Sequence, residues 1–205
     1  MAIRTANNQS LTEITAFPSA VALGGMVLLE TQTASSSATI DFTDNIDSTY
    51  SEYIFTFTDI HPATNRAIFQ FQSDTGTNTS YNITTTAAYF AAYHKEDGTS
   101  TSLAYNETHD DVQSTSFLNL TVQASDDNDS CASGILHVFE PSSATFVKQF
   151  YSRVSHSYEE SGGDNYAWDN YKGGYFNTTT ALTRFQFKYS TGNIDSGTFK
   201  LYGVT

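Results

Sequence analysis

Apolar and polar side chains alternate with a period of two through much of the chain after residue 25. In one clear example, Tyr53, Phe55 and Phe57 alternate with Ile54 and Thr56. This alternation is typical of a strand that buries one aromatic face. Comparable runs recur between polar turns, and we predict strands over residues 26–29, 38–43, 53–57, 68–73, 81–85, 117–122, 135–139, 146–154, 174–178, 182–189 and 198–204.

Turn signals suggest how some of these strands are connected. Residues 61–65 (HPATN) separate two alternating runs, which we interpret as a hairpin. Residues 190–197 (STGNIDSG) form a glycine-bounded turn of the kind that links antiparallel strands. Residues 87–93 (AAYFAAY) have helical propensity, but their flanks make a strand at least an equal alternative.

Two polar stretches, residues 95–116 and 125–133, are predicted to be long surface loops on either side of a strand. Many short strands with regular turns, and no alternation of strands with helices, are typical of a sandwich or jelly roll. We therefore predict an all-β fold, an antiparallel β-sandwich or jelly roll, over residues 25–205.

The first 24 residues differ from the rest of the chain. Ile3, Leu11, Ile14 and Phe17 are scattered through a polar segment. Such a segment cannot form a core alone, so it is either a flexible terminus or an extended arm ordered by a partner. We predict a domain organisation in which residues 1–24 form an arm for attachment or oligomerisation, followed by the β-sandwich.

Composition and charge narrow the possible partners. The chain has 15 Phe and 13 Tyr, while only 15% of its residues are charged, and 22 acidic against 9 basic residues give a net charge of -13. Such a surface repels nucleic acid, whose binding depends on Lys and Arg. No stretch approaches the ~18 apolar residues that a membrane helix needs, and no signal peptide is evident. We expect a soluble protein made in a cytoplasm, with no membrane insertion.

Signals for catalysis and for bound metal are weak. Cys131 is the only cysteine, so neither an internal disulfide nor a zinc site built on cysteine pairs is possible. The chain has no Gly-x-Ser-x-Gly turn and its histidines are scattered, so we predict that it is not an enzyme. Asp126, Asp127 and Asp129 could hold Ca²⁺, but a solvated acidic turn is the preferred interpretation, and we expect no cofactor.

An aromatic segment near residue 170 is the candidate binding surface. Tyr166, Trp168, Tyr171 and Tyr175 occur within a few residues of one another, together with Asp and Asn. We predict that they lie in a glycine-flanked loop. Three interpretations are open: Trp168 closes one end of the sandwich, the aromatic residues form a protein interface, or they bind a glycan.

Segments at both ends of the chain carry a resemblance to a known group of proteins. Residues 7–18 (NNQSLTEITAFP), residues 60–64 (IHPAT) and residues 194–203 (IDSGTFKLYG) resemble small virion structural proteins, including tail-fibre-like ones, of marine tailed bacteriophages. The resemblance implies a virion component such as a tail fibre, a head or tail decoration, or an adhesin, which is often a homo-oligomer. It implies no catalytic residue.

Two functions follow as hypotheses. In the leading one, the chain is a phage virion structural protein, made in the host cytoplasm, that assembles with itself and with other virion proteins. A trimer is the favoured form. In the alternative, it is a carbohydrate-binding module at a fibre tip that attaches the phage to a host surface glycan.

Overall fold

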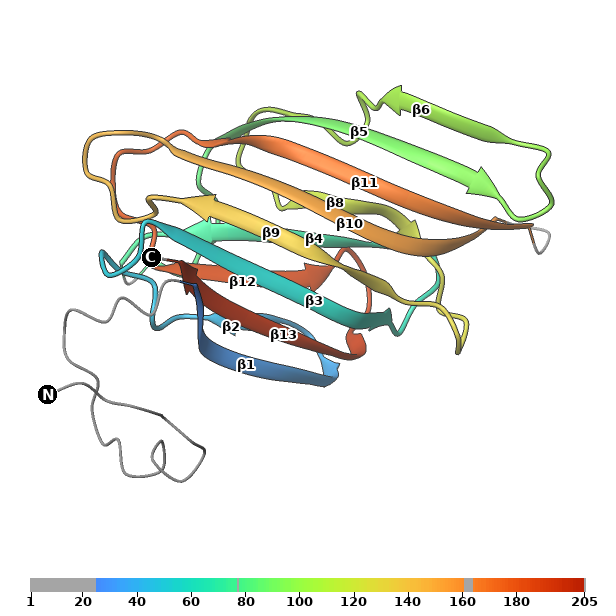
Figure 1. Ribbon diagram of the computed structural model, residues 1–205, viewed down its shortest axis with the longest axis horizontal. Coiled ribbons are helices and arrows are strands. Elements are labelled where there is room, and N and C mark those ends of the chain that lie inside the picture. Colours follow the sequence, from blue (N-terminus) through green and yellow to red (C-terminus); the bar gives the residue numbers. More distant parts are fainter. Residues whose placement is uncertain (1–24, 77, 161–163, 205) are drawn as a thin grey trace, which may run out of the picture.

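A computed structural model describes residues 25–76, 78–160 and 164–204 (Figure 1). Over these residues the chain is all-β, with antiparallel sheets packed as a β-sandwich, which confirms the predicted fold class. The more specific jelly-roll arrangement stays a prediction. The predicted arm residues Ile3, Leu11, Ile14 and Phe17 lie outside the described residues.

The described residues form strands and no helix. The strands are β1 (Met26–Ser37), β2 (Ile40–Phe42), β3 (Glu52–Pro62), β4 (Ala67–Asp74), β5 (Thr85–Lys95), β6 (Thr101–Tyr105), β7 (Asp111–Ser114), β8 (Leu118–Ala124), β9 (Ala132–Phe139), β10 (Lys148–Glu160), β11 (Asp164–Phe176), β12 (Arg184–Tyr189) and β13 (Ile194–Val204). It follows that this part of the chain contains no helix that could span a membrane.

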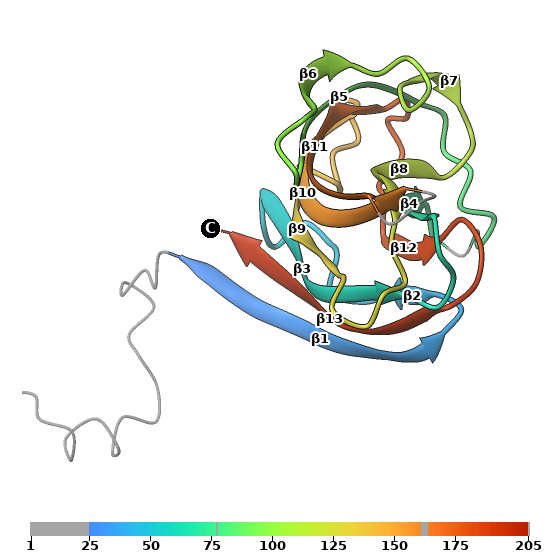
Figure 2. The same ribbon diagram turned by 90° about the vertical axis from the view of Figure 1, so that its right-hand side faces the viewer.

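The strands form two sheets of unequal size. The large sheet has nine strands in the order β1-β13-β3-β9-β10-β11-β5-β6, with β7 also pairing with β5. The small sheet has four strands in the order β2-β12-β4-β8. The large sheet curls around the small one (Figure 2), so it has an inner face toward the small sheet and an outer face on the other side.

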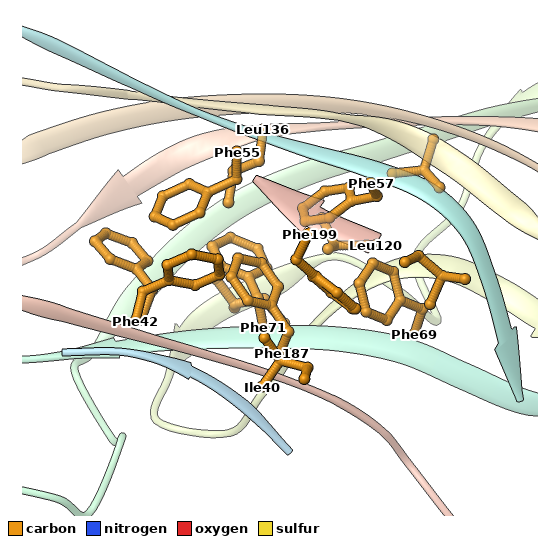
Figure 3. Packing of buried hydrophobic residues seen from close by; sticks show 14 of the residues in the cluster. Ile40, Phe42, Phe55, Phe57, Phe69, Phe71, Leu120, Leu136, Phe187 and Phe199 are labelled. Carbon is orange, nitrogen blue, oxygen red and sulfur yellow. The ribbon is translucent and has the colours of Figure 1, made fainter. Parts of the chain in front are cut away.

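Phenylalanine rings from both sheets fill the space between them (Figure 3). Phe57 of β3 meets Phe69 of β4 edge-to-face, with ring centroids 5.2 Å apart, and also contacts Phe187 of β12 at 5.1 Å. Burial of each such ring contributes roughly 1.5–3 kcal/mol. The period-two pattern of aromatic residues therefore supplies the inner faces of β3, β4 and β12.

Two predicted connections are wrong. Strand β3 belongs to the large sheet and β4 to the small one, so the turn between them crosses the sandwich and forms no hairpin. The same holds for β12 and β13, which the glycine-bounded turn joins across the sandwich. Alternation marks the buried face of a strand but does not identify its hydrogen-bonded partner. The two pairs of consecutive strands, β3 with β4 and β12 with β13, belong to different sheets.

The predicted limits of several elements also differ from the structure. Residues 87–93 lie in strand β5 and not in a helix, whereas no strand covers residues 81–84. The predicted loop over residues 95–116 contains strands β6 and β7. Both pair with β5 at one edge of the sheet, where most of their side chains are exposed, so their sequences lack an apolar alternation.

Candidate functional site

Strand β11 carries the four aromatic candidates, and the prediction of a loop around them is wrong. It pairs with β10 on one side and with β5 on the other, inside the large sheet. Glycine is needed here because a Cβ on Gly174 would lie 2.2 Å from the carbonyl oxygen of Thr86 and 2.6 Å from the Cα of Ala87. Gly174 therefore permits the close approach of β11 to β5 and does not mark a turn.

Alternation along β11 divides the four aromatic residues between two faces. Tyr166 and Trp168 lie on the inner side and line a common cleft. Tyr171 and Tyr175 lie on the outer face. The structure therefore brings Tyr166 and Trp168 together in one cleft, whereas Tyr171 and Tyr175 belong to a separate surface.

The cleft lies between the two sheets and has a volume of about 460 Å³, within the range of small-molecule sites. We call it the aromatic cleft. Its large-sheet side consists of four rings: Tyr93, Tyr158, Tyr166 and Trp168. Its opposite side comes from β4, β8 and the β6–β7 connection: Ile68, Thr108, His109, Val122 and Gln123.

The four rings of the aromatic cleft pack against one another. The centroid of Trp168 is 4.7 Å from that of Tyr93 and 6.5 Å from that of Tyr158. Tyr166 lies 5.7 Å from Tyr93 and 5.8 Å from Tyr158. Nε1 of Trp168 is buried and has no hydrogen-bond acceptor among the described residues. The rings are thus held in place by mutual contact, with one donor left without a partner.

His109 contributes a defined hydrogen-bonding group to the opposite side. Its Nδ1 accepts a 2.8 Å hydrogen bond from Nδ2 of Asn119, whose Oδ1 accepts a 2.7 Å bond from Nε2 of Gln70. Burial, and then the nearby charge of Lys172, lower the pKa of His109 below 6.5. The imidazole is therefore neutral at pH 7 and carries its proton on Nε2. No described residue is a partner for this Nε2.

Gln123 and Arg66 form a bridge at the rim of the cleft. Nε of Arg66 donates to Oε1 of Gln123 at 3.0 Å, and Nη2 of Arg66 donates to the hydroxyl of Tyr158 at 3.2 Å. The guanidinium also lies 5.9 Å from the centre of the Tyr158 ring. This arrangement leaves the amide nitrogen of Gln123 without a described partner.

A buried polar network lies behind the aromatic cleft and joins the two sheets. Oδ1 of Asn170 accepts from the hydroxyl of Tyr89 at 2.6 Å and from the backbone N of Val122 at 3.4 Å. Its Nδ2 donates to the carbonyl oxygen of Val154 at 2.8 Å and to Nδ1 of His156 at 2.9 Å. Buried polar groups are costly unless paired, and here the pairing fixes β11 against β8.

Lys172 of β11 attaches the β6–β7 region to that strand. Its ammonium group is paired with the carboxylate of Asp111 and donates to the carbonyl oxygen of His109 at 2.7 Å. It also lies 5.4 Å from the centre of the Tyr89 ring. Burial lowers the pKa of Lys172, while Asp111 opposes this change. The ion pair thereby positions His109 at the cleft.

The outer face of the large sheet carries a second group of aromatic residues. Tyr171 stacks on Phe90, with centroids 4.8 Å apart and the planes only 3° from parallel. Tyr151 stacks in the same way on His137, at 4.4 Å and 16°. Phe90 and Tyr151 are 43% and 47% exposed, respectively. This surface is an ordered aromatic layer with no covering element among the described residues.

The calcium candidate gains no support from the structure. Oδ2 of Asp127 accepts from the Ser125 hydroxyl at 3.1 Å, while its carbonyl oxygen is bonded to Nε2 of His61 at 3.0 Å. Among the residues that the structure describes, no group of three or more His, Cys, Asp or Glu is arranged to hold a metal. Asp126, Asp127 and Asp129 therefore form no such group.

Sequence reasoning missed Tyr93, Tyr158, His109 and Gln123, which complete the aromatic cleft. Tyr93 continues the inward alternation of Tyr89 in β5, so its direction could have been read from the sequence. The distances in sequence are large, however, and no local pattern links β5, β8, β10 and β11.

Comparisons of the chain with family models, with curated proteins and with solved structures found no match.

Proposed function

We propose that the chain is a structural protein of a phage virion that acts by assembling with further copies of itself and with other virion proteins. The observation that carries this proposal is the set of exposed apolar side chains on the outer face of the large sheet. Exposed apolar surface can mark an interaction site. These side chains extend from one edge of the sheet to the other: Met26 and Leu28 on β1, Tyr151 on β10, Phe90 on β5, and Leu103 and Tyr105 on β6.

Charge on this face favours a second copy of the chain as its occupant. The protein as a whole is strongly acidic, with a net charge of -13, which opposes self-association. On the outer face, however, Arg153 forms an ion pair with Asp169 at 2.7 Å, and His137 contacts Glu52 at 2.5 Å. Arg153 offsets the charge of Asp169, which lowers the repulsion between two copies that meet on this face.

The position of the first strand supports a role for the N-terminal segment in the same assembly. Met26 and Leu28 of β1 pair with Val204 and Tyr202 of β13, so the described chain begins at one edge of the large sheet. Fully extended, 24 residues reach about 80 Å. In the proposed assembly the arm extends to a neighbouring virion subunit, with Ile3, Leu11, Ile14 and Phe17 as its apolar anchors.

Sedimentation velocity of the full chain tests the role of the outer face. We expect a homo-oligomer, with a trimer favoured, and we expect Tyr151→Glu to dissociate it by placing a charge in the aromatic layer. Phe146→Glu is the matched control, because Phe146 is 72% exposed but lies between β9 and β10 and not on a strand.

Two results would contradict the proposal. A wild-type chain that stays monomeric at tens of micromolar would remove the evidence for self-assembly. A Tyr151→Glu variant that keeps the wild-type sedimentation coefficient would show that the interface lies elsewhere.

A further inference from the structure

We infer that the aromatic cleft is a binding site for a neutral pyranose sugar, held between the four rings of the large sheet and the polar groups of His109 and Gln123. This inference goes beyond assembly and does not depend on it. Inner and outer residues alternate along β11, so the cleft and the outer face are separate surfaces of the same strand.

The ring side of the cleft suits the apolar face of a sugar. A pyranose presents axial C–H groups on its faces, and these pack on the electron-rich faces of Trp and Tyr. Tyr93, Tyr158 and Tyr166 already contact one another or Trp168 through their rings, with centroids 4.7–6.5 Å apart. Because the rings are fixed before binding, little side-chain entropy is lost when a ligand enters.

The opposite side supplies polar groups that match sugar hydroxyls. His109 presents a neutral Nε2–H donor, since its Nδ1 is occupied by Asn119 at 2.8 Å. The amide nitrogen of Gln123 is a second donor, with its orientation fixed by the 3.0 Å bond from Arg66 to Oε1. Thr108 adds a hydroxyl that both donates and accepts. A few placed polar groups in a mostly apolar cleft are typical of ligand sites.

The electrostatics of the cleft favour a neutral ligand. Among the residues that the structure describes, its lining contains no Asp, Glu, Lys or Arg. The nearest guanidinium, that of Arg66, already donates to Gln123 and Tyr158. A charged ligand would lose its hydration without gaining a counterion, and an acidic sugar would also meet the net charge of -13. Neutral hexoses and N-acetylhexosamines satisfy these conditions.

Trp168 permits a direct test, because it is the only tryptophan in the chain and it lines the cleft. The full chain is titrated with methyl glycosides of glucose, galactose, mannose and N-acetylglucosamine while its fluorescence is recorded. We expect at least one of them to give a saturable change in emission. Glucuronate, the matched anionic probe, should bind at least about tenfold more weakly.

Variants on the two sides of the cleft locate the site. Tyr158→Ala removes a ring and Gln123→Ala removes a donor, and each should weaken binding about tenfold or more. Tyr175→Ala is the control, because it removes a tyrosine from the outer face of the same strand and should leave the affinity unchanged. Near-ultraviolet circular dichroism of each variant verifies that the fold is intact.

Three outcomes would overturn the inference. The first is a fluorescence signal that no sugar changes. The second is binding that survives both cleft variants or is lost in Tyr175→Ala. The third is saturation by indole or p-cresol with none by the glycosides, which would identify the cleft as a socket for an aromatic side chain of a partner protein.

Discussion

His156 lies buried between the sheets as a neutral imidazole. Its Nε2 donates to the carbonyl oxygen of Gln123 at 3.0 Å, and burial lowers its pKa from 6.5 to about 4. In the unfolded chain this residue gains a proton near pH 6.5. Between pH 6.5 and 4 the unfolded state therefore binds more protons, and the free energy of unfolding falls as the pH falls. Above pH 6.5 the effect is absent.

We expect His156→Gln to reduce this pH dependence. For one such histidine, the loss of stability between pH 7 and pH 5 is about 2 kcal/mol, and the Gln side chain has no proton to gain. Urea unfolding of both proteins at the two pH values measures the difference. His94→Gln serves as control, because His94 is exposed on β5. Equal pH dependence in wild type and His156→Gln would show that His156 is not responsible.

Asn170 is the second residue whose replacement should have a large effect. Asn170→Ala removes four hydrogen bonds and leaves the buried Tyr89 hydroxyl and the Val122 backbone N–H without their acceptor. We expect a loss of about 3 kcal/mol in the free energy of unfolding, measured with urea. Asn165→Ala changes an exposed position on the same strand and should cost little. A loss below about 1 kcal/mol in Asn170→Ala would contradict the network's structural role.

At the scale of elements, the ion pair of Lys172 with Asp111 attaches the β6–β7 region to β11, in addition to the pairing of β6 and β7 with β5. Lys172→Met removes the partner of Asp111 and the donor to the His109 carbonyl oxygen. Breaking such a pair typically costs about 3 kcal/mol or more, because the remaining charge stays partly buried. We expect faster hydrogen exchange in β7 and its flanking residues, measured by mass spectrometry. Lys200→Met on the outer face should leave that exchange unchanged, and unchanged exchange in Lys172→Met would refute the attachment.

The strands themselves could be predicted from the sequence where one face is buried. Tyr53, Phe55 and Phe57 alternate strictly because they fill the core from β3. The pairing of β3 with β9 and β13 could not be predicted, since partners far apart in sequence leave no local signal. Consecutive strands such as β3 and β4 look like a hairpin in sequence even though they face each other across the core.

The candidate site could be predicted only in part. Clustering of Tyr166 and Trp168 indicated a binding surface, and both residues line the cleft. Gly173 and Gly174 suggested a loop, but Gly174 is required by the close approach of β5, and in sequence such a glycine resembles one required by a turn. His109 lies in a polar segment, and its role depends on Lys172, which is 63 residues away in sequence.

At the scale of the whole molecule, the described strands supply a large buried core of their own. The buried cluster draws its members from Ala34 onward among the described residues. We expect a chain lacking residues 1–24 to keep its melting temperature but to lose incorporation into the virion, since anchors such as Leu11 and Phe17 are each worth roughly 1.5–3 kcal/mol when buried against a partner. Melting curves and uptake during particle assembly measure the two effects.

A substitution series supplies the matched control for this truncation. Replacing Ile3, Leu11, Ile14 and Phe17 by Ser keeps the length of the arm and removes its apolar side chains. Loss of uptake in both the truncated and the substituted chain would assign attachment to these residues. Normal uptake would refute the role of the arm, whereas a collapsed melting transition in the truncated chain would mean that the arm belongs to the domain's own sheet.

The pairing of the first strand with the last has a consequence for how the protein is made. Strand β1 has β13 as its only hydrogen-bonded neighbour among the described strands, and Thr33 lies opposite Thr198. At about 5–20 residues per second, a ribosome needs roughly 10 to 30 seconds to synthesise the intervening segment. During that time β1 has no partner, and its exposed apolar residues are open to nascent chains on the same messenger. We therefore expect the rate of translation to affect how often β1 pairs with the correct strand.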